Sequence, residues 1–467
     1  MRRGAEIVSD LINCLGVESV LTNAIEMEPF AIDWRGMFQG HPLAVVVPRC
    51  VDEVARIVQN CADRGVGIVP AGGRTGLAGG ATPDASGEEI VMSLHRLDRI
   101  REVDLLSETM TVEAGCILAN AQRAAADAGL LLPINLASEG SVQIGGAIAT
   151  NAGGSNVLRY GMARNRLLGL EVVLADGTIL TGLRALRKDN AGYDWKHWFV
   201  GSEGTLGIIT ATVLQLVPAT SFSATMLIGY NTLAEAINGL RALRCAVGDS
   251  ITAFELMERS AIDRSADLLG VNRLLTKQPW LALVEGRSAL SAIEQALPEA
   301  CIAEMEAGRI ADAVLASSVA QATALWRLRE SITEAEAHAG PSLKHDISVP
   351  ISSLTAFVDA ATVLLESRWP GVQRNLFGHA GDGNLHFNVI CPPGVNTSGL
   401  SEAIHDCTVS HGGSISAEHG IGQYRVSELE RLRPEAEINI MWRMKKMLDP
   451  AGILNPGKVM HKIAPAF

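Results

Sequence analysis

The sequence predicts a mixed α+β protein with more than one domain, on three observations. The chain has 467 residues, which is more than a single hydrophobic core ordinarily organises. Apolar residues make up 48% of it, enough to fill a large core. Short β-branched runs alternate with amphipathic helical runs, and the character of this alternation changes after Pro218. We therefore expect a domain boundary near residue 218.

The composition narrows the class of protein further. A formal net charge of −12 disfavours general binding to nucleic acid. The eight cysteines form no CxxC pair, which indicates reduced thiols rather than a disulfide scaffold or a zinc ribbon. No apolar run approaches the roughly 18 residues of a membrane span, and the N-terminal segment resembles neither a secretory signal nor a transit peptide. We expect a cytoplasmic protein, and its oligomeric state stays open, with a homodimer among the possibilities.

The first part of the chain opens with a predicted β-α-β unit. Residues 43–47 and 66–70 are apolar strands, and residues 51–65 between them form a helix with one apolar face. Asp52 and Glu53 occupy the first turn of that helix, where carboxylates are favoured by the helix dipole. Further strands are expected at 89–94, at 109–115, in a hairpin over 167–180 that turns at Asp176-Gly177, and at 207–218.

The second part of the chain has a different alternation. Over residues 219–370, strands such as 281–286 alternate with long Ala-rich helices, which we expect at 289–307 and at 318–338, the latter ending near Gly340. The last predicted helix, 434–447, is followed by a compact turn rich in Pro and Gly.

Three separated segments are rich in small residues. The first, PAGGRTGLAGGATP (70–83), follows directly on a strand and contains five glycines and one arginine. Glycine lets backbone N–H groups converge on an anion such as a diphosphate, although a flexible surface loop is the alternative explanation. The second and third, 138–161 and 199–210, allow close backbone approach to a flat ring or a phosphate. The chain contains no GxGxxG and no GxxxxGK[ST], so a Rossmann dinucleotide site and a P-loop are disfavoured.

Histidines gather in the last third of the chain, where five of the eleven fall between residues 379 and 419. His379 and His386 flank the turn AGDGN, and in the strand LHFNV the side chains of His386 and Asn388 share one face while Leu385, Phe387 and Val389 share the other. SISAEHGIG (414–422) adds Glu418 and His419. Two imidazoles and a carboxylate are a usual set for a divalent cation such as Zn, Mn, Fe or Co. The alternative is a pair of core histidines and a surface glutamate.

A helix in the second part carries groups that could bind an anion. Arg329 and Thr333 are four residues apart, so they share a helix face, and Lys344 follows in an extended segment. An arginine fork can make two parallel charge-assisted bonds to a carboxylate. A solvated helix face is the alternative, because several glutamates lie close by in the sequence.

Taken in order, the three small-residue segments resemble the FAD-binding domain of the vanillyl-alcohol oxidase and p-cresol methylhydroxylase superfamily, and the resemblance covers nearly the whole chain. It implies an FAD-binding domain of two α/β subdomains over 1–218 (core about 38–218), a substrate domain with a helix-flanked sheet over 219–425, and a C-terminal helical segment, 426–467, that returns to the flavin. The first segment would wrap the FAD diphosphate, and the other two would line the isoalloxazine and the adenine-ribose part. We expect the FAD to be non-covalent, because no histidine occurs between His95 and His197. The residues that the resemblance assigns to FAD are Pro70, Ala71, Gly72, Gly73, Arg74, Thr75, Gly76, Leu77, Ser138, Gly140, Ser141, Gly145, Gly146, Thr150, Asn151, Gly153, Gly154, Gly161, Glu203, Gly207, Ile208, Ile209 and Asn455.

GHAGDGNLH and SAEHG are similar to the C-terminal part of the D-2-hydroxyacid dehydrogenase branch, which includes enzymes for D-lactate, glycolate and D-2-hydroxyglutarate. DWRG (33–36) is similar to the hydroxyglutarate members. The resemblance implies a metal site, with zinc as the expected ion, an acid/base and a substrate site. The metal ligands would be His379, His386 and Glu418, the acid/base would be His419, and the substrate would meet Arg329, Thr333, Lys344 and Asn388.

The reaction implied by the resemblance is oxidation of a D-2-hydroxy acid to the 2-oxo acid, with D-2-hydroxyglutarate as the expected substrate. The metal would lower the pKa of the hydroxyl, His419 would remove its proton, and the hydride would pass to flavin N5. Electrons would leave to an electron-transfer flavoprotein or a quinone rather than to NAD. The alternatives are a D-lactate or glycolate dehydrogenase and a non-catalytic flavin-binding subunit of an oxidase complex. A plain metal-binding module would not explain the first 218 residues.

Overall fold

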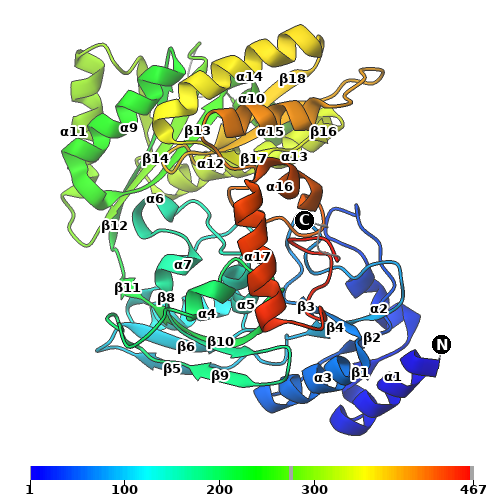
Figure 1. Ribbon diagram of the computed structural model, residues 1–467. Coiled ribbons are helices and arrows are strands. Elements are labelled where there is room, and N and C mark those ends of the chain that lie inside the picture. The colour runs from blue at the N-terminus through cyan, green and yellow to red at the C-terminus, as the bar shows by residue number, and fades with distance from the viewer. Residues whose placement is uncertain (1, 273–276, 463–467) are drawn as a thin grey trace. The chain divides into compact units, whose positions relative to one another are not determined.

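The computed structural model describes residues 2–272 and 277–462. The chain divides into two compact units (Figure 1). Unit 1 comprises Met1–Ala152, Met162–Pro218 and Glu418–Phe467, and unit 2 comprises Gly153–Gly161 and Ala219–Ala417. Each unit has its own sheets and its own core.

The first sheet of unit 1 has four strands in the order β1-β2-β4-β3, and the last three run parallel. Helix α3 (Val51–Arg64) connects two of the parallel strands and buries one apolar face, while Gly65 ends it in the left-handed conformation, with φ 58°. The predicted β-α-β unit is therefore confirmed. The strands are β1 (Val20–Leu21), β2 (Ala44–Val46), β3 (Gly67–Ala71) and β4 (Glu89–Ser93).

The second sheet of unit 1 has five antiparallel strands in the order β5-β6-β10-β8-β9. The predicted hairpin is present, because β8 and β9 pair around a turn in which Asp176 Oδ1 accepts the N–H of Thr178 at 2.8 Å. The strands are β5 (Ile100–Asp104), β6 (Thr109–Glu113), β8 (Leu167–Val173), β9 (Ile179–Gly182) and β10 (Ile208–Gln215).

One hydrophobic core joins both sheets of unit 1 to the helices around them. The C-terminal segment reaches this core as well: Ile68 and Leu454 form a parallel bridge, and the N–H of Asn455 donates to the carbonyl of Ile68 at 2.7 Å. Asn455 is thereby held beside β3. The remaining elements of unit 1 are α1 (Arg2–Leu15), η1 (Val17–Ser19), α2 (Ala24–Ala31), α4 (Leu118–Asp127), β7 (Leu130–Leu131), α5 (Ile144–Ala149), α7 (Ala163–Arg166), α8 (Lys196–Phe199), β11 (Val217–Pro218), α16 (Val426–Leu432) and α17 (Glu435–Leu448).

Unit 2 is built on an eight-stranded sheet in the order β15-β12-β14-β13-β18-β19-β16, with β17 also pairing to β19. Its strands are β12 (Phe222–Tyr230), β13 (Ile251–Glu258), β14 (Trp280–Ser288), β15 (Asp312–Leu315), β16 (Ser342–Leu343), β17 (Asp346–Ser348), β18 (Gln373–Gly378) and β19 (Asn384–Ile390). The other elements are α6 (Val157–Tyr160), α9 (Leu233–Val247), η2 (Gly248–Ser250), α10 (Arg259–Leu269), α11 (Ile293–Glu306), α12 (Val319–Glu330), α13 (Ile332–Ala339), η3 (Ile351–Ser353), α14 (Leu354–Arg368) and α15 (Leu400–Ser410).

Helices cover both faces of this sheet. Helices α9, α11, α14 and α15 share the larger core with one face, and α10, α12 and α13 share a smaller core with the other (Figure 1). Alternation along each strand decides which side chain meets which layer. Phe254 and Leu256 enter the larger core, so Glu255 and Met257 face the layer of α12.

The β18–β19 hairpin extends this polar side of the sheet. Leu385, Phe387 and Val389 are fully buried in the larger core, which confirms the apolar face predicted for them. His386 lies opposite Phe377, a member of the smaller core, and so belongs to the other face. Asn375 and Asn388 are paired two positions further along and share that face. The face toward α12 and α13 is therefore the polar one.

The structure corrects two predicted helices. The helix expected at 289–307 begins four residues later, as α11, because Leu290 donates its N–H to the Ser288 hydroxyl in a turn after β14. The helix expected at 318–338 is two helices, α12 and α13. Ser331 lies between them with ψ −4°, outside the regular helical range. Arg329 and Thr333 consequently belong to different helices.

The boundaries of the two units differ from those of the predicted domains in two places. The segment around α6 packs against β13 and joins unit 2. Residues 418–425 join unit 1, since the N–H groups of Ile421 and Gly422 donate to the Glu203 carboxylate and that of Gln423 donates to the Ala78 carbonyl.

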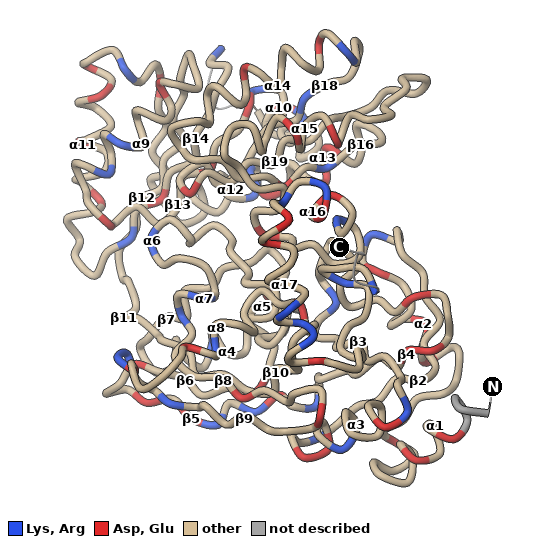
Figure 2. Tube along the Cα trace, in the orientation of Figure 1, with Lys and Arg blue, Asp and Glu red and all other residues tan. Residues whose placement is uncertain are grey.

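Basic and acidic residues are interspersed along the chain in both units (Figure 2). Among the described residues, we find no helix with the length and apolar character that crossing a membrane requires.

Candidate functional site

A pocket in unit 1 lies where the three small-residue segments come together. It is open to solvent and has an empty volume of about 930 Å³. Most of the residues predicted to bind FAD are in its wall, and His419 is there too. The lining residues are Pro70, Ala71, Gly72, Gly73, Arg74, Thr75, Gly76, Ala78, Gly80, Ala81, Leu94, Ala114, Val142, Gly145, Gly146, Ala149, Thr150, Glu203, Gly204, Gly207, Ile208, Ile209 and His419.

The glycines of this pocket serve two different purposes. A Cβ on Gly73 would come within 2.0 Å of the Ser141 carbonyl oxygen, so the first and second segments touch backbone to backbone there. A Cβ on Gly145 would come within 2.6 Å of the Ala114 Cβ. Gly146 is different, because a Cβ there would meet no atom within 4 Å. Its bare backbone therefore faces open space in the pocket wall, which suits a flat ring or a phosphate.

Two residues tie the pocket to the C-terminal part of the chain. The Glu203 carboxylate accepts the N–H groups of Ile421 at 2.7 Å and Gly422 at 2.8 Å. Burial raises the pKa of this carboxyl. The side-chain N–H₂ of Asn455 donates to the carbonyls of Gly80 at 2.9 Å and Glu203 at 2.7 Å. These bonds fix the turn that follows His419.

The polar groups in and beside the pocket fit a bound FAD. Arg74 is the cation among the lining residues, and its guanidinium stacks on the Phe30 ring at 4.3 Å from the centroid. The buried oxygens Gln143 Oε1 and Asn455 Oδ1 have no hydrogen-bond partner among the described residues. Gln143 Oε1 is 3.5 Å from where a Gly72 Cβ would stand, and the Asn455 side chain bonds to the carbonyls of the lining residues Gly80 and Glu203. Acceptors left open beside a Gly-rich wall are what a flavin or its ribityl chain would complete.

Nine residues predicted to bind FAD are not among the lining residues of this pocket, and the role of all the predicted residues in FAD binding stays a prediction. Three of them belong to unit 2 rather than unit 1. The nine are Leu77, Ser138, Gly140, Ser141, Asn151, Gly153, Gly154, Gly161 and Asn455.

On the polar face of unit 2, a buried carboxylate joins a predicted metal ligand to a predicted substrate residue. Glu255 Oε1 accepts from His379 Nδ1 at 2.6 Å, and Glu255 Oε2 accepts from Arg329 Nε at 2.8 Å. β13 pairs Leu256 with Gly378 of β18, and Glu255 and His379 are the residues next to this pair. Although burial acts to raise it, the charges of His379 and Arg329 hold the pKa of Glu255 at about 2. In the neutral tautomer whose Nδ1 donates to this carboxylate, the free electron pair of His379 is on Nε2, which is then the nitrogen that can ligate a cation.

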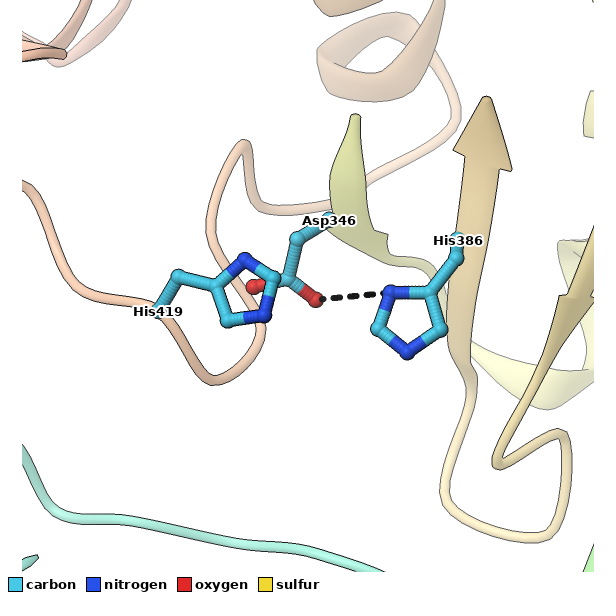
Figure 3. A group of neighbouring side chains, drawn as sticks. All are labelled: Asp346, His386 and His419. Carbon is cyan, nitrogen blue, oxygen red and sulfur yellow. Dashed lines mark ion pairs between the residues drawn. The ribbon is translucent and has the colours of Figure 1, made fainter. Parts of the chain in front are cut away.

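A buried acid also lies beside the second predicted imidazole ligand. Asp346 Oδ1 lies 3.7 Å from His386 Nδ1 (Figure 3). The same oxygen accepts from Asn384 Nδ2 at 3.0 Å. The Asp346 carbonyl accepts the N–H of Ala417 at 3.1 Å. Ala417 is the last residue of unit 2, so Glu418 and His419 are the first two residues of the chain beyond it.

Two groups of side chains here could hold a metal ion. One is His379, His386 and Glu418, and the other is Asp346, His386 and His419, which Figure 3 draws. In each group the ligand atoms lie within 4.8 Å of one another. Nitrogen and carboxylate oxygen donors in this ratio suit a first-row divalent cation. The three predicted ligands thus form one of these groups.

The predicted substrate residues have unequal surroundings. Asn388 donates from Nδ2 to Glu336 at 2.7 Å and accepts the His345 N–H on Oδ1 at 3.2 Å. The Lys344 ammonium lies 3.7 Å from the same Glu336 carboxylate. Arg329 is buried, whereas Thr333 is exposed on α13. The structure therefore brings Lys344 and Asn388 together through Glu336, and the break at Ser331 separates the environments of Arg329 and Thr333.

Two of the five clustered histidines are explained by packing within unit 2 rather than by a metal or substrate site. His405 packs edge-on against His345, with ring centroids 5.6 Å apart. His411 packs edge-on against Phe357 and bonds through Nδ1 to the Cys407 carbonyl. The clustering along the sequence therefore overstated the size of the site, as the core-histidine alternative allowed.

Sequence reasoning missed three acids at this site: Glu255, Glu336 and Asp346. All three are almost fully buried. A signal for Glu255 was available, because ITAFELME places an acid at the centre of an otherwise apolar strand. A lone acid in such a run needs a buried partner. Glu336 and Asp346 lie beside charged residues in the sequence and carry no comparable signal.

Comparison with known proteins finds matches along most of the chain. The family described as "FAD binding domain" matches residues 42–182, and the family described as "FAD linked oxidases, C-terminal domain" matches residues 220–459. The chain is 36% identical to the mitochondrial D-2-hydroxyglutarate dehydrogenase of Bos taurus, over 94% of this chain and 81% of that protein. It is 38% identical to a D-2-hydroxyglutarate dehydrogenase of Xanthomonas citri pv. viticola, over 94% of both.

Among solved structures, p-cresol methylhydroxylase with substrate bound is similar with a TM-score of 0.77 at 14% identity, over 99% of this chain and 98% of that one. An identity this low bears on the fold alone. The fold it indicates is the one expected from the three small-residue segments.

Proposed function

Because this chain belongs to the family of FAD linked oxidases, we propose that it oxidises D-2-hydroxyglutarate to 2-oxoglutarate with FAD as its redox cofactor. We propose this activity because the two relatives of 36% and 38% identity are named D-2-hydroxyglutarate dehydrogenases. The observation that carries the proposal is the pair of imidazoles His379 and His386, each beside a buried acid, in a group that also contains Glu418.

In this proposal the substrate is held mainly by cations and amides of unit 2. Arg329 and Lys344 would meet the two carboxylates of a dicarboxylic hydroxy acid, because both are cations within the polar region of unit 2. Asn388 would donate the second hydrogen of its amide, since its other groups are bonded to Glu336 and His345. Thr333 would contribute a hydroxyl from the exposed side of α13.

His419 is the proposed acid/base. Its side chain lines the pocket of unit 1, and its backbone is held two residues upstream of the turn that Glu203 fixes. A ring nitrogen of His419 would take the proton of the substrate hydroxyl, and an imidazole suits this step at neutral pH. The proposal requires the substrate's C2 to lie between this ring and the pocket.

Two groups from outside the chain complete the proposed site. FAD, held without a covalent bond by the three small-residue segments, supplies the acceptor for the two electrons removed from the substrate. A divalent cation held by His379, His386 and Glu418, which we propose to be zinc, withdraws electron density from the hydroxyl and carboxylate oxygens. Glu255 would orient the His379 imidazole through its hydrogen bond, and Asp346 lies 3.7 Å from the His386 imidazole.

The electrons must then leave the protein. An electron-transfer flavoprotein or a quinone is the acceptor we propose, and NAD is not, because the chain carries no Rossmann fingerprint.

The proposal is tested by a substrate panel. The purified FAD-loaded protein is mixed anaerobically with D-2-hydroxyglutarate, D-lactate or glycolate, and bleaching of the flavin absorbance is followed. D-2-hydroxyglutarate should reduce the flavin fastest, since the other two offer only one carboxylate to Arg329 and Lys344. Faster reduction by D-lactate or glycolate would reassign the substrate, and reduction by no hydroxy acid would favour a non-catalytic flavin-binding subunit.

A further inference from the structure

Glu255 is a single carboxylate with two partners of different function in the proposed site. One oxygen accepts from the Nδ1 of His379 at 2.6 Å, and the other accepts from the Nε of Arg329 at 2.8 Å. The Glu255 side chain is 1% exposed, so neither bond is in competition with solvent. All three residues belong to unit 2.

The bond to His379 affects cation binding. A carboxylate on Nδ1 fixes the ring orientation and the tautomer, and it makes Nε2 a stronger electron-pair donor. His379 follows directly on β18, where the chain turns toward β19. Its ring therefore depends on Glu255 for its orientation more than a residue inside a strand would.

The bond to Arg329 affects substrate binding. Glu255 holds the guanidinium by its Nε edge, and the Phe377 ring stacks on it at 4.9 Å from the centroid. The Nη edge is then the one that can receive a substrate carboxylate. The carboxylate also balances the charge of a cation that is almost fully buried.

We propose that Glu255 is a positioning residue shared by the cation and the substrate, which prepares His379 for a divalent ion through one oxygen and Arg329 for the substrate carboxylate through the other. This inference rests on the proposed function, and it assigns a role to a residue that contacts neither group itself. Its consequence is that one substitution weakens two binding events that are otherwise separable.

The test uses the FAD-loaded full chain, stripped of metal with a chelator. Zinc and manganese binding are measured separately by calorimetry, and KM and kcat for D-2-hydroxyglutarate are measured after metal is restored at saturation. Glu255→Gln should raise the metal dissociation constant about 10- to 100-fold and should raise KM about tenfold in the same protein. Arg329→Met should raise KM but leave the metal dissociation constant within about threefold, because Glu255 still holds His379.

Glu285→Gln is the matched control. Glu285 is also a buried acid in the same sheet, where it accepts from Arg287 Nε at 2.6 Å and from Trp326 of α12 at 3.2 Å. It bonds to neither His379 nor Arg329, so both constants should stay within about threefold of the parent.

Glu255→Asp guards against a folding defect in the glutamine variant. It keeps the counter-charge for Arg329 but withdraws the carboxylate by about one carbon–carbon bond, ~1.5 Å, so metal affinity should still fall at least fivefold. Parent-like metal affinity in either Glu255 variant, with FAD content retained, would overturn the inference. A parent protein that binds no metal, or is not reduced by the hydroxy acid, would instead contradict the proposed function.

Discussion

The pocket of unit 1 and the polar sheet face of unit 2 are built in opposite ways. The pocket wall is mainly backbone and small side chains, and its shape depends on glycines where no Cβ fits, such as Gly73, or where none is present to fill space, such as Gly146. The polar face of unit 2 contains buried acids beside basic side chains, among them Glu255 with Arg329 and Asp346 with His386. In the proposed function, a bulky cofactor is accommodated by omitting side chains, whereas a small, highly charged substrate is accommodated by placing them.

This difference sets how each region responds to substitution. A wall made of backbone is damaged by added volume, because main-chain atoms cannot move aside by a change of rotamer as side chains can. A buried ion pair is damaged by removal of one partner, which leaves a charge without compensation. Substitutions in the two regions should therefore differ in both the kind and the size of their effects.

The largest effect is expected where the two regions meet in sequence, at His419. His419→Ala should slow flavin reduction by D-2-hydroxyglutarate about 10²- to 10⁴-fold, while FAD content and metal content are kept. Rapid-mixing absorbance under anaerobic conditions measures this rate. His338 is an exposed histidine on α13, so His338→Ala is the control, and its flavin should be reduced at the parent rate. Full-speed reduction of the His419 variant would remove this residue from the chemistry.

Two glycines separate tight contact from open space within the pocket. Gly73→Ala should destabilise the apoprotein by about 1–3 kcal/mol, since its Cβ would meet the Ser141 carbonyl oxygen. Gly146 lies in α5, and a Cβ there would meet no neighbouring atom. Gly146→Ala should therefore leave the unfolding free energy of the apoprotein unchanged or raise it by up to ~1 kcal/mol through helix propensity. It should nevertheless weaken FAD binding, because the methyl group occupies pocket space.

Calorimetry of the apoproteins and fluorescence titration with FAD distinguish these two outcomes. An unchanged melting temperature for Gly73→Ala would contradict the backbone contact. Parent-like FAD affinity in Gly146→Ala would show that the flavin does not approach this wall.

In unit 2, Glu336 is expected to show the cost of removing one buried charge. Its carboxylate accepts from Asn375 Nδ2 at 2.6 Å and from Asn388 Nδ2 at 2.7 Å. Glu336→Gln can keep one oxygen for these two donors, but its N–H₂ group would then face the Lys344 ammonium, which lies 3.7 Å from the other carboxylate oxygen. This should lower the free energy of unfolding by about 1–3 kcal/mol and raise KM through Lys344. Glu334→Gln, exposed on the same helix, should change neither quantity. Denaturant unfolding and steady-state kinetics measure both, and a neutral Glu336 variant would contradict the network.

The smallest effect is a pH dependence in unit 1. Although burial acts to raise it, hydrogen bonds from Lys462 and Ser86 hold the pKa of Asp84 at about 2, below its ordinary 3.8. A lowered folded pKa adds stability above pH 3.8 that is lost as the pH falls toward 2. Because Asp84 is partly solvated, about 1 kcal/mol is expected. Asp84→Asn should flatten the unfolding free energy over this interval, and an unchanged slope would contradict the ion pair.

The parts of the fold that could be predicted are those with local signals. The β-α-β opening follows from the apolar face of 51–65 and the left-handed glycine that ends it. The hairpin at Asp176-Gly177 and the apolar face of Leu385, Phe387 and Val389 follow from turn chemistry and period-two alternation. Such signals depend on neighbours within a few residues, so one sequence contains them.

The candidate site was predictable only in part, for a physical reason. His379, His386 and Glu418 stood out because ligand-type residues are rare in apolar frames. The acids that orient them come from β13 and β17, and these reach the histidines only through sheet pairing over separations of more than 35 residues. The break between α12 and α13 at Ser331 was likewise invisible, because serine is compatible with a continuing helix. Pairing partners and helix breaks of this kind are decided by the tertiary structure.

The central claim is that a divalent cation on His379, His386 and Glu418 acts together with FAD on a hydroxy acid. The most direct measurement is anaerobic flavin reduction by D-2-hydroxyglutarate in chelator-stripped, FAD-loaded protein as zinc or manganese is added back. Reduction that is slow without metal and saturates at one ion per chain is the predicted result. Full reduction in the metal-free protein would contradict the account.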